Sequence, residues 1–87
     1  MTFWAGAGLG CFRDGTRVHV SSVARLSEAT LSVGEVKRLV RPDRRDGFLA
    51  MAERVASVRS YGDLAGCAQL LDGRAEAWVE TGVQVWD

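Results

Sequence analysis

The stretch from Arg59 to Asp87, which decides the fold, reads RSYGDLAGCAQLLDGRAEAWVETGVQVWD. It places apolar residues at the spacing of one helix face, namely Leu64, Cys67, Ala68 and Leu71. Gly73 follows the last of these, where helices commonly end. Two runs with strand character, Ala75–Glu80 and Val83–Trp86, then close the chain on either side of Thr81-Gly82. The stretch therefore predicts a helix followed by paired strands.

The N-terminal part of the chain carries the signal of a β-hairpin. Asp14-Gly15 separates the runs Cys11–Arg13 and Arg17–Ser21. Asp-Gly between two such runs favours a tight primed turn, because glycine accepts positive φ without steric cost. A further apolar run, Phe3–Ala5, precedes a glycine-rich connection. This part predicts strand, turn and strand.

The middle of the chain predicts a second helix between two short strands. Its helix face consists of Phe48, Met51, Ala52 and Val55. We expect Asp43 or Asp46 to cap this helix, and Thr30–Val33 and 56–61 to form the strands. Gly34–Arg45 reads as a loop with at most one helical turn.

Residues 22–29 read as a short helical turn capped by Ser21 or Ser22. The alternation of strands and helices predicts an α/β fold: a small mixed sheet with the two main helices packed on one face. We expect residues 1–87 to form a single, partial domain.

Composition limits the partners of the chain. Eleven Lys and Arg balance eleven Asp and Glu over 87 residues, so no net charge attracts nucleic acid or an anionic membrane. A basic run at Lys37–Arg45 includes acidic residues and reads as a solvated loop, with a salt-dependent nucleic-acid binder as the weaker alternative. No run approaches the roughly 20 apolar residues that cross a bilayer. We expect a cytoplasmic protein that binds neither nucleic acid nor membrane.

Several side chains that often carry chemistry have structural readings here. Cys11 and Cys67 lack the spacing of a zinc site and read as reduced thiols. His19 lies on the polar face of a strand with no nucleophile motif near it, so we expect a surface histidine. The tryptophans read as core or interface aromatics: Trp4, Trp78 and Trp86. The sequence predicts no catalytic residue.

The better candidates lie from Gly62 onward. A glycine directly before a helix lets backbone N–H groups approach an oxygen-rich ligand. Asp63 is either a plain helix cap or an acceptor for substrate hydroxyl or amine groups. Glu80 and Asp87 lie on neighbouring predicted strands, so their carboxylates are expected to converge at one sheet edge, although Glu80 also reads as a solvent-facing strand residue.

These residues and motifs resemble the inositol monophosphatase family, particularly its histidinol-phosphatase branch. The resemblance rests on Tyr61-Gly62-Asp63 at a helix start, the helix end Leu71–Glu76, and Trp86-Asp87. The segment from Gly10 to Ser32 is similar to the hairpin and strand that precede them in the family. We expect the chain to be the C-terminal portion of that fold, ending at the Trp-Asp motif.

The resemblance implies a Mg²⁺-dependent phosphomonoesterase, in which the metal activates water for attack on phosphorus. It implies a metal ligand at Asp87 and substrate contacts at Gly62, Asp63 and Glu80. The family's upstream Glu and its Asp-Pro-x-Asp-Gly-Thr element have no counterpart in this sequence. We therefore expect a truncated or split phosphatase that binds a phosphorylated small molecule, holds Mg²⁺ weakly or not at all, and lacks activity alone.

The alternative function is a non-catalytic oligomeric binding or assembly module derived from the same fold. A cut through the fold leaves sheet edges and apolar helix faces uncovered. In both cases we expect a homodimer or a complementary chain as partner.

Overall fold

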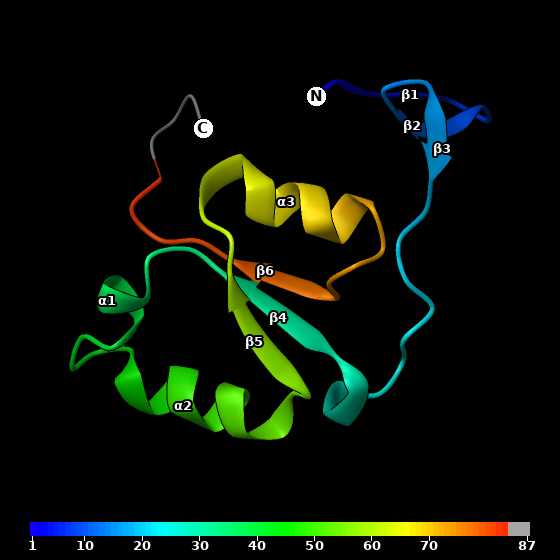
Figure 1. Ribbon diagram of the computed structural model, residues 1–87. Coiled ribbons are helices and arrows are strands. Elements are labelled where there is room, and N and C mark those ends of the chain that lie inside the picture. The colour runs from blue at the N-terminus through cyan, green and yellow to red at the C-terminus, as the bar shows by residue number, and fades with distance from the viewer. Residues whose placement is uncertain (84–87) are drawn as a thin grey trace.

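The computed structural model describes residues 1–83, with the side chain of Asp63 left out (Figure 1). The strands are β1 (Phe3–Gly6), β2 (Gly10–Arg13), β3 (Thr16–Val18), β4 (Thr30–Val33), β5 (Ser57–Ser60) and β6 (Ala77–Val79). The helices are the 3₁₀ helix η1 (Leu26–Glu28), α1 (Val36–Leu39), α2 (Arg45–Arg54) and α3 (Asp63–Leu71). The predicted α/β class is confirmed, and the predicted strands at Thr30–Val33 and within 56–61 are present.

The strands form two separate three-stranded sheets instead of the one mixed sheet that we expected. The first is the antiparallel meander β1-β2-β3. Its predicted hairpin turn is confirmed: Asp14 and Gly15 have φ of 47° and 84°, as a primed turn requires. Across β1 and β2 the rings of Trp4 and Phe12 stack with centroids 4.5 Å apart.

The second sheet is parallel, in the order β5-β4-β6. The chain runs from β4 through α1 and α2 to β5 on one side, then returns through α3 to β6 on the other (Figure 1). Because crossovers between parallel strands are right-handed as a rule, this reversal places α2 and α3 on opposite faces. The expectation of both main helices on one face was therefore wrong.

Side chains of β4 alternate between the two faces. Leu31 and Val33 are buried against Leu39 of α1, and three half-buried residues pack on this core: Phe48, Val55 and Val58. Ser32 points to the other face, beneath α3. The stripe that we predicted on α2 is thus a core face, with Met51 at its exposed margin.

The predicted caps of two helices, η1 and α2, are wrong. The residue before η1 is Arg25 and the residue before α2 is Arg44, and neither makes a side-chain capping bond. Arginines instead bind carbonyl groups at the end of α1: Arg45 Nε donates to the Val40 carbonyl at 2.9 Å, and Arg44 Nη1 to the Arg38 carbonyl at 3.4 Å. The basic run at 37–45, predicted as a solvated loop, therefore includes most of α1 and two arginines whose side chains bond backbone carbonyl groups.

The predicted helix after Tyr61 is confirmed as α3. The residue before it is Gly62, with φ of 72°, so Asp63 is the first helical residue. At the other end Gly73 has φ of 77°, and the Arg74 N–H bonds the Gln69 carbonyl at 2.9 Å, which is a glycine-terminated helix end. Val83 is not in a strand, and 84–86 lie outside the described residues. Within residues 1–83, none of the helices has the length and apolar character to cross a membrane.

Candidate functional site

A cavity of about 1050 Å³ opens where the parallel strands end. Gly34 follows β4, Ser60 ends β5 and Glu80 follows β6. Carboxyl ends of parallel strands meet at one sheet edge, and ligands of open α/β sheets bind there. The full lining is Gly34, Glu35, Arg38, Ser60, Tyr61, Gly62, Leu64, Trp78, Glu80, Thr81, Gly82 and Val83.

Gly34 holds the three strand ends together. Its N–H donates to the Val79 carbonyl at 2.9 Å, and its carbonyl accepts the Ser60 hydroxyl at 2.8 Å. A Cβ at position 34 would overlap the Glu80 carboxylate. Glycine at this position therefore leaves the space that the carboxylate occupies.

Glu80 presents an acceptor at this edge. The residue is half-buried, and its Oε2 atom is buried without a hydrogen-bond partner among the described residues. A carboxylate so placed is an acceptor for ligand hydroxyl or ammonium groups. Since unpaired buried polar atoms are costly, a ligand that donates to Glu80 gains that free energy.

The first turn of α3 forms another wall of the cavity. Gly62 and Leu64 both line it, and at this end the Gly66 N–H donates to the Gly62 carbonyl at 3.2 Å. The earlier N–H groups of the helix have no intrahelical acceptor and favour a polar or anionic oxygen.

Trp78 forms the floor on β6, beneath α3. A Cβ on residue 66 would lie 2.8 Å from Trp78 Nε1 and 3.0 Å from Ser32 Oγ, so Gly66 lets the helix approach the indole. Neither polar atom has a hydrogen-bond partner within the described part. Trp78, which the sequence predicts as a core or interface aromatic, is half-buried and lines the cavity.

The predicted site residues come together only in part. Gly62 and Glu80 line the same cavity. Asp63 begins α3, but its side chain is not described, and Asp87 lies outside the described residues. His19 is exposed, as expected, and is absent from the cavity lining that the structure describes.

Sequence reasoning missed three contributors to the cavity: Gly34, Ser60 and Arg38. The first two follow or end strands of a parallel sheet, and that position is itself a signal once strand order is known. Arg38 had been grouped with the basic run, and no sequence pattern connects it to Thr81.

The described residues do not fit a magnesium site by themselves. No group of three or more His, Cys, Asp or Glu side chains gathers within residues 1–83, apart from the undescribed Asp63 side chain. Magnesium requires near-octahedral oxygen coordination, usually from carboxylates, phosphate and waters. The described residues alone therefore do not account for metal-assisted hydrolysis.

Comparisons with known proteins agree with this fold. No family model matches the chain. A histidinol-phosphatase of Mycobacterium tuberculosis is 38% identical over 90 residues, covering 98% of this chain and 35% of that protein.

Solved structures give the same result. Extragenic suppressor protein suhB from Bartonella henselae matches with a TM-score of 0.81 and 26% identity, over 98% of this chain and 33% of that one. Inositol monophosphatase from Anabaena matches with a TM-score of 0.77 and 31% identity, over 98% of this chain and 36% of that one. Over nearly its whole length, the chain is therefore similar to about one third of a protein of the inositol monophosphatase family. Its curated relatives named histidinol-phosphatase come from three organisms, and it spans between 27% and 35% of their lengths.

Proposed function

We propose that this chain forms one wall of the substrate pocket of a histidinol-phosphatase-like phosphomonoesterase and does not hydrolyse phosphate esters alone. The observation that carries the proposal is the Glu80 carboxylate, which lies against Gly34 at the mouth of a cavity with one oxygen that has no hydrogen-bond partner among the described residues. The sequence similarity to histidinol-phosphatases supports the same substrate class.

The ligand that fits this wall is a small phosphorylated molecule with hydroxyl or ammonium groups. Glu80 accepts hydrogen bonds from those groups, and the N-terminus of α3 faces oxygen atoms. Cavity residues such as Leu64 and Trp78 supply apolar contact for the carbon skeleton.

Hydrolysis requires groups that the described residues do not supply. Magnesium, when bound in the complete site, lowers the pKa of a bound water and neutralises charge that develops on phosphate. By resemblance Asp87 is the one metal ligand of this chain. We propose that the other acidic ligands come from outside residues 1–87.

Two assays test this proposal. Calorimetric titration with L-histidinol phosphate should show binding that Glu80→Gln weakens roughly tenfold or more, because a hydrogen bond to a charged group is lost. Glu53→Gln, on the exposed side of α2, is the matched control and should bind like wild type. Equal affinity of the Glu80→Gln and wild-type chains would contradict the binding role.

The second assay measures phosphate release from the same ligand and from inositol monophosphate at millimolar Mg²⁺. We expect no release above that of a Glu80→Ala, Asp87→Ala double variant. Release above that level would show that the chain is competent alone.

The alternative is an oligomeric module without catalysis. Apolar side chains at the rim of the cavity favour it, because Tyr61, Leu64 and Val83 are 44%, 68% and 56% exposed. Light scattering and the calorimetric titration together separate the two functions. A discrete homodimer in light scattering that shows no binding of histidinol phosphate supports the module, whereas ligand binding supports the pocket wall.

A further inference from the structure

We propose that Arg38 is a positioning residue that sets the orientation of Glu80 through the backbone of the segment after β6. This inference rests on the proposed function, since it concerns the same pocket. Arg38 lies on α1, between β4 and α2 in the sequence, and Glu80 lies far along the chain. The two are connected by contacts that no sequence pattern indicates.

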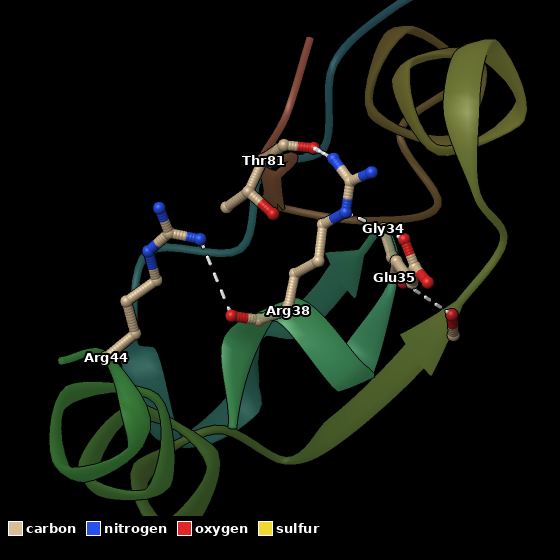
Figure 2. A network of polar contacts seen from close by, with 6 residues as sticks. Gly34, Glu35, Arg38, Arg44 and Thr81 are labelled. Atoms are coloured by element: carbon tan, nitrogen blue, oxygen red, sulfur yellow. Dashed lines mark hydrogen bonds and ion pairs between the residues drawn. The ribbon is translucent and has the colours of Figure 1, made fainter. Parts of the chain in front are cut away.

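The first contact joins Arg38 to the segment that carries Glu80. Arg38 Nη1 donates to the Thr81 carbonyl at 3.2 Å, as Figure 2 shows. Gly82 has φ of 71°, and a Cβ there would overlap the Arg38 guanidinium. The guanidinium therefore packs directly on the backbone of the two residues that follow Glu80.

The second set of contacts fixes Arg38 itself. Its Nε atom pairs with Glu35 Oε2 at 2.9 Å, and its carbonyl accepts from Arg44 Nη1 at 3.4 Å (Figure 2). A guanidinium presents several donors in a rigid plane, so one side chain bonds Glu35 and Thr81 together. Arg38 is thus bonded to the residues directly before α1 and α2, and it contacts the segment after β6.

On the other side, Gly34 limits where the Glu80 carboxylate can lie. The Gly34 N–H bonds the Val79 carbonyl, directly before Glu80, and the carboxylate lies against Gly34. Residues 79 to 82 are therefore held at both ends, by Gly34 before Glu80 and by Arg38 after it. Loss of the Arg38 contact releases one end and leaves the carboxylate free to leave the cavity.

The test compares three single variants. Arg38→Ala removes the side-chain contacts with Thr81 and Glu35. Arg38→Lys keeps the positive charge but lacks the planar guanidinium. Lys37→Ala removes one exposed positive charge from the same helix. Lys37 makes no hydrogen bond or ion pair to another described side chain. For affinity we expect Lys37→Ala to match wild type, Arg38→Ala to bind L-histidinol phosphate about tenfold more weakly, and Arg38→Lys to fall between them.

A double-variant comparison separates positioning from a general loss of structure. If Arg38 acts through Glu80, then Arg38→Ala should cause no further loss of affinity in a Glu80→Gln background. An equal loss in both backgrounds would overturn the proposal. If Arg38→Ala does not fold, the same comparison with Arg38→Lys decides.

A ligand-free measurement keeps this inference distinct from the proposed function. In ¹³C and ¹⁵N spectra of the chain, Arg38→Ala should shift the Glu80 side-chain carboxyl and the Thr81 amide, while Lys37→Ala leaves both unchanged. Unchanged Glu80 and Thr81 signals in Arg38→Ala would contradict the positioning role. Shifted signals in a chain that binds no histidinol phosphate would instead reject the proposed function alone.

Discussion

Gly34 shows how one residue type determines the shape of the candidate site. Every amino acid other than glycine has a Cβ atom, and a Cβ at position 34 would overlap the Glu80 carboxylate. Neighbouring backbone groups cannot move aside easily, because Gly34 bonds both Val79 and Ser60. The glycine therefore serves close approach of a functional side chain.

We predict that the single substitution Gly34→Ala displaces the Glu80 carboxylate. It should abolish calorimetric binding of histidinol phosphate and lower the free energy of unfolding by about 1–3 kcal/mol, as overpacking does. Gly47→Ala is the control, because nothing lies within 4 Å of its Cβ position inside α2. That variant should keep binding and raise stability by about 0.5–1 kcal/mol in denaturant unfolding. Binding by Gly34→Ala at wild-type affinity would contradict this account of the site.

Sequence reasoning reached some of these residues and not others. Gly62 and Glu80 were predicted as substrate contacts from the family resemblance, and they line one cavity. Gly34 and Arg38 could not be predicted, because their roles depend on a carboxylate and a carbonyl that are distant in sequence. Local pattern identifies a residue type and its element, whereas a tertiary contact requires the strand order.

Among the elements, α3 and the hairpin were predictable because their signals are local. Helical spacing, Gly73 and Asp-Gly act within a few residues of themselves. The caps of η1 and α2 were mispredicted, because Ser, Thr and Asp before a helix indicate only a preference. Placement of both helices on one face was wrong, since it depends on the order β5-β4-β6, which periodicity does not reveal.

The antiparallel sheet is joined to the end of α3 by an ion pair. Arg13 Nε lies 3.1 Å from Asp72 Oδ1, and the side chains are 35% and 7% exposed. The pair is held by charge without a well-aligned hydrogen bond among the described residues. Gly73 adds a close approach, because a Cβ there would lie 2.7 Å from the His19 carbonyl oxygen.

We therefore predict that Asp72→Ala lowers the free energy of unfolding by about 1–3 kcal/mol, because it leaves the partly buried Arg13 charge without its partner. In a double-variant cycle with Arg13→Ala, the coupling should be about 0.5–3 kcal/mol. The exposed pair Asp43–Arg44, 3.7 Å apart, provides the comparison, and Asp43→Ala should change stability by less than about 0.5 kcal/mol. Additive effects at Arg13 and Asp72 would show that the ion pair does not join the two parts.

For the molecule as a whole, the apolar core and the cavity lie at different places on the parallel sheet. One face, with α1 and α2, contains the apolar core of Leu31, Val33 and Leu39. The carboxyl edge carries the cavity, and the antiparallel sheet lies apart from both (Figure 1). A second, smaller cavity of about 310 Å³ includes Arg25, Thr30 and Glu76, residues near the opposite ends of the parallel strands. The two cavities provide distinct locations that a binding experiment can tell apart.

The most direct test of the account is a ¹H–¹⁵N titration of the labelled chain with L-histidinol phosphate. We expect saturable chemical-shift changes at the amides of Gly34, Ser60, Gly62 and Glu80, and no change in the hairpin around Asp14. Shifts that appear around the second cavity instead, or amides at the carboxyl edge that do not respond, would contradict the claim that this edge binds the ligand.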